Sequence, residues 1–221
     1  GGYFNSASGD KATVGGGYIN VAGGYAATVG GGVANDASGF AATVAGGLSN
    51  LAGGDYSFAV GRRAYIDDTH GGAFLFADQT DATFYSASAN EFAIRANGGV
   101  RIVTNSGSGA GVGLIAGDTS WNVLSAKEAK ENYTNIDPAA ILESVSNLPI
   151  QRWNYIHQDD SIQHIGPYAK DFYDAFGLHG EYKGTISSQD VDGVALAAIQ
   201  GLNTKLEQEI DEKKALIADL Q

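Results

Sequence analysis

The sequence contains no cysteine and no methionine, and only 3 of its 221 residues are proline. Without cysteine the chain cannot form a disulfide framework or a thiolate metal site. Basic residues are also scarce: 13 Lys and Arg stand against 25 Asp and Glu, a net charge of -12. Because nucleic-acid binding needs a basic surface, this charge argues against a nucleic-acid partner. The sequence offers no signal peptide and no apolar run near the length that spans a bilayer.

Glycine and proline are unevenly distributed along the chain. All three prolines follow residue 124, whereas most of the 32 glycines precede it. We therefore expect two differently built parts that meet near residue 125. Because the chain lacks methionine and begins within a repeat, we expect it to be the C-terminal part of a longer protein.

Residues 1–60 repeat with a period of 15. Each unit opens with Gly-Gly and continues with an asparagine, and the first three units close with Ala-Thr-Val. A fixed period with glycine and asparagine at two places predicts two short strands and two tight turns per unit, because both residues tolerate positive φ. Stacked units form parallel sheets. The inward residues are small, so one such coil buries little apolar surface, which favours oligomerisation. The repeated asparagines are Asn5, Asn20, Asn35 and Asn50.

Three functional interpretations of the repeat are possible: a calcium-binding roll, an ice-binding face and a spacer. A calcium-binding roll needs aspartate at a fixed place in each unit, but Asp10, Asp36 and Asp55 fall at different phases. An ice-binding face needs rows of aligned threonines. Each of the first three units offers only one aligned threonine, and the fourth unit has none. The repeats could also be a spacer without any ligand site.

The pattern G-G-Y-x-N-x-A-(S/G)-G-x-x-A-T-V resembles the head repeats of trimeric autotransporter adhesins. That resemblance implies a trimeric parallel β-roll of a kind that binds host matrix or other cells. The period here is longer than the usual repeat of that family.

Residues 61–120 depart from the repeat and are predicted to form a β-rich neck. Asp67, Asp68 and His70 indicate a solvated loop, with a metal site as the alternative. Alternation over 91–95, a Gly-Gly pair and an apolar run over 100–103 predict a hairpin.

After residue 125 the pattern is that of a compact domain. Asp137 is placed to cap a helix that begins at Pro138. A strand is expected over 151–155, a turn over 164–167 and a helix over 168–176. A last helix is expected from about Val194 to the end.

The last helix carries apolar residues at heptad spacing, which is typical of a coiled coil. Asn203 lies on one heptad line, where it can set register and chain number, and Lys213 weakens the other. The alternative is an amphipathic helix that packs on its own domain. The two lines are Leu196, Asn203, Ile210 and Ile217, and Ile199, Leu206, Lys213 and Leu220.

Ser125 and Lys130 lie five residues apart where the two parts meet. A serine hydroxyl is a poor nucleophile, and a lysine becomes its base only when burial or a neighbouring cation favours the neutral amine. Lys127 could supply that cation, whereas Glu128 and Glu131 would oppose it. In the alternative interpretation, Ser125 is the N-cap of a helix over 127–133.

Four motifs occur together from residue 124 onward: L-S-A-K-E-A-K-E-N-Y (124–133), L-P-I-Q-R-W-N-Y (148–155), H-I-G-P-Y-A-K-D-F-Y-D-A-F-G-L (164–178) and D-V-D-G-V-A-L-A-A-I-Q-G-L (190–202). They resemble the C-terminal intramolecular chaperone of endosialidases and phage tailspikes. The resemblance implies a trimeric module that assembles the upstream fibre and then cleaves itself after a serine, through a Ser-Lys dyad. Ser125 and Lys130 match the dyad, but Ala126 replaces the aspartate that follows the cut.

The sequence therefore predicts a multi-domain chain: a trimeric parallel β-roll (1–60), a β-rich neck (61–120), an α+β chaperone domain (121–195) and a trimeric coiled coil (196–221). The predicted catalytic residues are Ser125 and Lys130, and the cleavage junction is Ser125–Ala126. No cofactor or metal is expected. The expected partners are two further copies, the upstream fibre as client and a host-surface ligand of the missing head. The expected setting is a bacterial surface or a phage tail fibre, and the alternative is a structural stalk or adhesin fragment without proteolysis.

Overall fold

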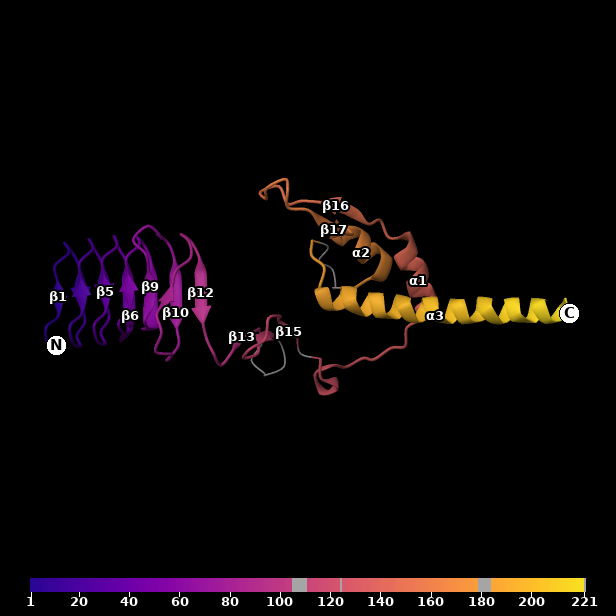
Figure 1. Cartoon of the computed structure of the whole chain (residues 1–221), viewed down its shortest axis with the longest axis horizontal. Coiled ribbons are helices and arrows are strands. Elements are labelled where there is room, and N and C mark those ends of the chain that lie inside the picture. The colour runs from indigo at the N-terminus through magenta and orange to yellow at the C-terminus, as the bar shows by residue number, and fades with distance from the viewer. Residues whose placement is uncertain (105–110, 124, 179–183, 221) are drawn as a thin grey trace. The chain divides into compact units, whose positions relative to one another are not determined.

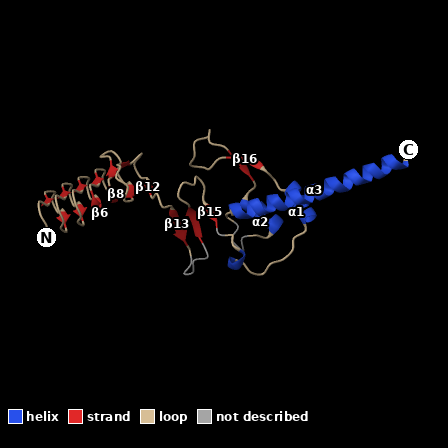
Figure 2. Cartoon of the chain, turned by 60° about the horizontal axis from the view of Figure 1, so that its bottom comes forward, coloured by secondary structure: helices blue, strands red, loops and turns tan. Residues whose placement is uncertain are grey.

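A computed structural model describes residues 1–104, 111–123, 125–178 and 184–220. The chain divides between Leu124 and Ser125 into two compact units (Figure 1). The first unit is all β and the second is mainly helical (Figure 2). None of the described helices combines the length and the apolarity that crossing a membrane requires.

Residues 1–95 of the first unit form a β-solenoid whose two sheets each contain six parallel strands, one from every turn. Equivalent residues of successive units lie side by side: Ser6 pairs with Val21, and Thr13 with Thr28. The predicted parallel solenoid is confirmed. One sheet contains β1 (Ser6–Ala7), β3 (Val21–Ala22), β5 (Asp36–Ala37), β7 (Leu51–Ala52), β9 (Ala64–Ile66) and β11 (Phe84–Tyr85). The other contains β2 (Thr13–Val14), β4 (Thr28–Val29), β6 (Thr43–Leu48), β8 (Phe58–Arg62), β10 (Phe74–Ala77) and β12 (Phe92–Arg95).

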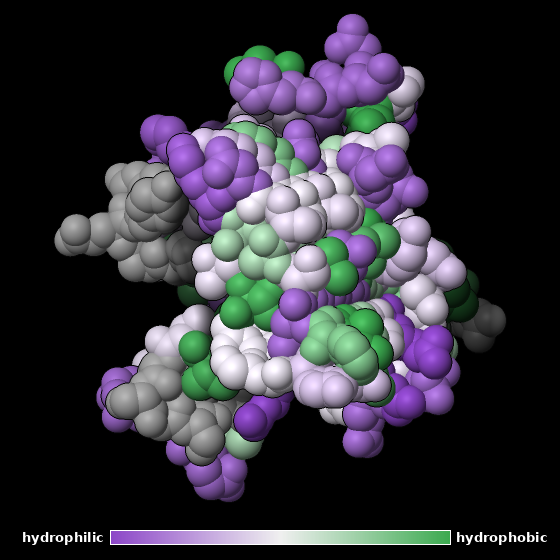
Figure 3. All heavy atoms as spheres, turned by 90° about the vertical axis from the view of Figure 1, so that its left-hand side faces the viewer, coloured by the Kyte–Doolittle hydropathy of each residue, from purple (hydrophilic) through white to green (hydrophobic). Residues whose placement is uncertain are grey.

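The solenoid core is narrow and is filled by alanine and valine in its first turns. Small inward residues let the two sheets approach each other closely, but they bury little apolar area per turn. Large apolar side chains remain exposed in the first turn, where Tyr3 and Phe4 are 65% and 69% exposed. Figure 3, which faces that end of the chain, shows green apolar patches among hydrophilic atoms.

The prediction that the repeated asparagines form the turns is wrong. Their side chains point into the core instead. Asn20, Asn35 and Asn50 are at most 1% exposed. The Asn35 amide donates to Asn20 Oδ1 at 3.1 Å and to the carbonyls of Gly31 and Gly47. The left-handed turn position falls one residue earlier, for example at Ile19 and Ala34. An inward amide is tolerated because the ladder satisfies its donors and acceptors.

Residues 61–95, predicted to belong to the neck, continue the solenoid. Phe74 pairs in register with Phe58 on one side and with Phe92 on the other. The three rings stack at centroid distances of 5.0 and 4.8 Å. The spacing between these equivalent residues lengthens from 15 to 16 and then to 18, because the turns grow. The lengthened turns hide the repeat in the sequence, although Ile66 and Leu75 still fill the core.

The predicted hairpin between 91–95 and 100–103 is wrong. Residues 92–95 pair in parallel with β10, whereas β13 (Val100–Val103) pairs antiparallel with β14 (Gly111–Leu114). β15 (Asn122–Val123) completes a separate three-stranded sheet and so belongs to the first unit, not to the chaperone segment predicted from residue 121. The Gly-Gly signal does form a turn, since the Gly99 N–H donates to the Ala96 carbonyl. It connects two sheets rather than two paired strands.

The described residues of the second unit form a 3-10 turn, η1 (Lys127–Ala129), three helices and a two-stranded sheet. The elements are α1 (Pro138–Asn147), β16 (Gln151–Trp153), β17 (His164–Gly166), α2 (Ala169–Phe176) and α3 (Ser188–Asp219). The Asp137 carboxylate caps α1 by accepting from the Ala139 N–H at 2.9 Å, as predicted. The turn expected over 164–167 is instead strand β17, which pairs with β16.

The last helix begins at Ser188, six residues before the predicted start and before the predicted domain boundary at residue 196. Ser187 is the N-cap residue and Asp190 lies in the first turn, where a negative charge is favourable. Gly193, which precedes the predicted start at Val194, is therefore an interior residue of the helix.

Candidate functional site

The structure brings the predicted pair Ser125 and Lys130 together. The Lys130 Nζ donates to the Ser125 Oγ at 2.8 Å. The intervening 3-10 turn folds the chain back, because the Lys130 N–H donates to the Lys127 carbonyl at 3.0 Å. The predicted proximity of the two side chains is thus present, and their catalytic role stays a prediction.

Tyr133 holds the same turn from its C-terminal side. Its hydroxyl donates to the Lys127 carbonyl at 2.6 Å, and the Lys127 Nζ lies 5.9 Å from the centre of its ring. Tyr133 was not among the predicted site residues. The only signal is its place at the end of the motif that contains Ser125.

The alternative role of Ser125 as a helix N-cap is wrong. The helical segment that directly follows Ser125 is the three-residue turn η1, and its cap residue is Ala126, without a side-chain hydrogen bond. The serine hydroxyl is therefore engaged by Lys130 instead of a backbone N–H. Ala126 is extended, with ψ of 142°, so the Ser125–Ala126 peptide lies outside the turn.

The pair lies in a strap, residues 125–137, in which every residue is exposed. Within a single chain nothing removes water from Ser125 or Lys130. The observed hydrogen bond has lysine as the donor, whereas general-base catalysis requires the amine to accept the serine proton. In the isolated chain the Ser125 hydroxyl and the Lys130 amine therefore lie within reach of each other but are exposed to solvent.

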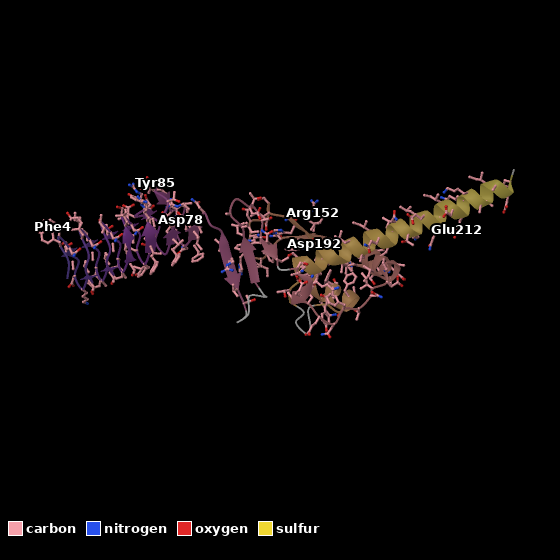
Figure 4. The ribbon with its side chains drawn as sticks, turned by 90° about the horizontal axis from the view of Figure 1, so that it is seen from below. Phe4, Asp78, Tyr85, Arg152, Asp192 and Glu212 are labelled. Carbon is pink, nitrogen blue, oxygen red and sulfur yellow. The ribbon has the colours of Figure 1, made fainter. Side chains whose placement is uncertain are left out.

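The heptad face of α3 does not pack on its own domain. α3 contacts α1 through small residues: Ala197, Ala198 and Gly201 are buried. A Cβ added at Gly201 would lie 2.2 Å from the Pro138 carbonyl oxygen, so the two helices nearly touch there. The apolar heptad residues lie on the other side and are exposed, and side chains project freely around the labelled Glu212 in Figure 4. They are Leu196, Ile199, Leu206, Ile210, Ile217 and Leu220.

An apolar cavity of about 630 Å³ opens beside the small sheet of the second unit. Its ten lining residues carry no charge. The cavity wall includes Trp153, whose indole Nε1 is buried away from solvent without a hydrogen-bond partner, which is costly for a polar group. Its main walls are Trp153, Tyr155, Ile156, Pro167, Tyr168 and Ile186. The sequence patterns at these residues did not predict the cavity.

The lengthened turns of the solenoid hold polar clusters that the sequence did not reveal as such. Asp78 pairs with Arg95 at 3.1 Å, and Figure 4 labels Asp78 on the solenoid. A hydrogen bond from the Asn97 N–H, with others from Thr80 and Arg95, lowers the pKa of Asp78 to about 2. Arg95 also donates to three carbonyls, which fastens the last turn of the solenoid.

The Asp67-Asp68-Thr69-His70 loop forms a hydrogen-bonded turn. The Asp67 carboxylate accepts from the Thr69 N–H and hydroxyl, which lowers its pKa. His70 Nδ1 lies 2.6 Å from the Ser86 hydroxyl. Across the described part of the chain, no three His, Asp or Glu side chains converge as a metal site would require.

Comparison with known proteins finds one segment of the chain similar to a protein family. Residues 125–181 match the family model described as chaperone of endosialidase. No curated protein matches the chain. The matched segment begins at Ser125 and includes Lys130, the strap, α1 and the small sheet. A β-solenoid followed by a segment of this family indicates a fibre-like protein associated with a chaperone module.

Proposed function

We propose that residues 125–221 trimerise and thereby assemble the solenoid that precedes them. The observation that carries this proposal is the orientation of α3, whose small-residue face packs on α1 while its apolar heptad face stays exposed. Exposed apolar residues at heptad spacing bury themselves against identical helices. The match of residues 125–181 to the endosialidase chaperone supports the same role.

Trimerisation would help the solenoid because its pairing is slow to form and its core is thin. Every strand pair in it joins residues at least 14 apart in sequence, and such contacts form late in folding. A C-terminal trimer raises the local concentration of three shafts and aligns them. We further propose that the assembled fibre works at a bacterial surface or in a phage tail, where it takes part in binding a host ligand.

We expect light scattering in solution to give three times the 22.8 kDa mass of the chain. Deleting residues 125–221 should leave the solenoid monomeric or aggregated, because the helix that gathers the chains is gone. A soluble trimer of residues 1–124 alone would contradict the proposal.

Substituting both Leu206→Asp and Ile210→Asp should weaken trimerisation roughly 1,000-fold, because it places unpaired charges in an apolar seam. Sedimentation over a concentration series measures the change. Ala215→Asp adds one such charge at an exposed position on the far side of the heptad pattern, and it should leave association within about threefold. Equal effects of the two changes would argue against a heptad seam.

A second function, self-cleavage after Ser125, is favoured by the 2.8 Å contact between Lys130 Nζ and Ser125 Oγ. Attack of the Ser125 hydroxyl on its own carbonyl carbon would close a strained four-membered ring. We therefore propose attack between copies in the trimer. The hydroxyl of one copy adds to the Ser125 carbonyl of another, and Lys130 takes the hydroxyl proton and delivers it to the leaving Ala126 nitrogen. Water then hydrolyses the ester and regenerates the serine.

We expect Ala126→Asp, which restores the acidic residue of the family motif, to speed the release of fragments 1–125 and 126–221 at least roughly tenfold. Intact-mass spectrometry over time measures the release. Ser125→Ala placed on the same background should abolish it. A tagged Ser125→Ala chain mixed into trimers with active chains should still be cut if attack occurs between copies. If Ala126→Asp remains uncut, self-cleavage by this pair is wrong.

A further inference from the structure

The strap and the apolar cavity of the second unit have complementary surfaces. In the strap, Tyr133 and Ile136 are 60% and 59% exposed. The segment 132–136, Asn-Tyr-Thr-Asn-Ile, carries no charge, like the residues that line the cavity. An exposed uncharged segment with apolar side chains gains free energy when an apolar surface covers it.

The strap also has backbone groups available to a partner. Among the described residues, no backbone N–H or carbonyl of residues 131–136 has a hydrogen-bond partner within the chain. A second copy can therefore bind this stretch without breaking any backbone hydrogen bond of the strap.

The strap and the cavity of one chain are not placed to meet. Figures 1 and 2 both show the strap and the β16–β17 sheet on opposite sides of α3. The end of the strap is fixed, because Pro138 packs against Gly201 of α3. A cavity on another copy is therefore the more accessible partner.

We propose that residues 132–136 of one copy dock in the apolar cavity of a second copy, with Ile136 as the apolar anchor. This inference rests on the proposed trimer. Docking would cover the neighbouring Ser125 and Lys130 and remove them from water. The pair would then change from an open contact to a buried one only after assembly, so that release of the module follows correct folding.

Cysteine cross-linking tests the docking directly, because the chain has no cysteine of its own. The test variant carries Ile136→Cys and Ile156→Cys, one in the strap and one in the cavity wall. Both side chains are exposed in the single chain, so each variant should fold. A short bismaleimide should convert most of the protein to covalent dimers and trimers. The matched control pairs Ile136→Cys with Ala215→Cys on the outer half of α3, and should give less than a tenth of that yield.

Light scattering on the same samples separates the two hypotheses. Interchain products that require the cavity cysteine support the docking. A trimer that gives no cross-link overturns the docking and leaves trimerisation standing. A reagent bridge within one chain shows that the strap docks in its own chain, and this also overturns the inference. A monomer without interchain products overturns both.

Discussion

Replacing Asn35 by alanine should destabilise the solenoid by about 3–5 kcal/mol. The side chain takes part in five hydrogen bonds: three that it donates, to Asn20, Gly31 and Gly47, and two that it accepts from Asn50. Each lost bond removes about 1 kcal/mol, and each buried group left without a partner adds about 1–3 kcal/mol, with incomplete additivity. The expected loss is a large share of the stability of a narrow core.

Hydrogen exchange followed by mass spectrometry measures this loss, because peptides from residues 1–95 report on the solenoid separately from the helices. Asn5→Ala is the graded control at the first rung. Asn5 takes part in three such bonds, and its end of the ladder is open to solvent. We expect its cost to be less than half that of Asn35→Ala. Equal and small effects would mean that the ladder does not stabilise the stack.

Replacing Gly201 by alanine should destabilise the second unit by about 1–3 kcal/mol, although alanine normally favours a helix. The new Cβ would lie 2.2 Å from the Pro138 carbonyl oxygen and 3.1 Å from Leu142 Cβ. Backbone cannot yield as a flexible side chain can, so α1 must move away from α3. That movement would also shift the end of the strap.

Gly193 supplies the matched control on the same helix. A Cβ there meets nothing within 4 Å, so Gly193→Ala should stabilise the unit by about 1 kcal/mol through helix propensity. Thermal unfolding followed by circular dichroism at 222 nm compares the two variants. The close packing of α1 on α3 would be contradicted if both substitutions stabilised the protein.

Local patterns predicted the elements whose causes are local. The 15-residue period predicted the parallel stack, because residues with the same neighbours adopt the same conformation in every turn. Asp137 followed by Pro138 marked the start of α1, since capping depends on two or three adjacent residues. The heptad spacing predicted a long final helix, but Gly193 hid its first turns.

Contacts distant in sequence decided the features that were missed. Residues 92–95 had a plausible partner eight residues later, yet they pair with β10, where Phe92 stacks on Phe74. The asparagines looked like turn residues because that preference is intrinsic to them. Only the neighbouring turns supply the carbonyls and amides that make the interior acceptable for them.

The features of the candidate site also fall into those that the sequence determined and those that the tertiary structure decided. The sequence alone determined that a serine and a lysine stand five residues apart at the junction of two differently composed parts, and that Ala126 follows the serine. The tertiary structure decided that the lysine amine reaches the serine hydroxyl, that the strap around them is exposed, and that α3 turns its heptad face outward. Spacing in the sequence determines only which side chains can reach each other. The exposure of a side chain, and the direction in which a helix face points, depend on the element that packs against the other side. The element that packs against α3 is α1, which covers Gly201 and leaves Leu206 and Ile210 exposed.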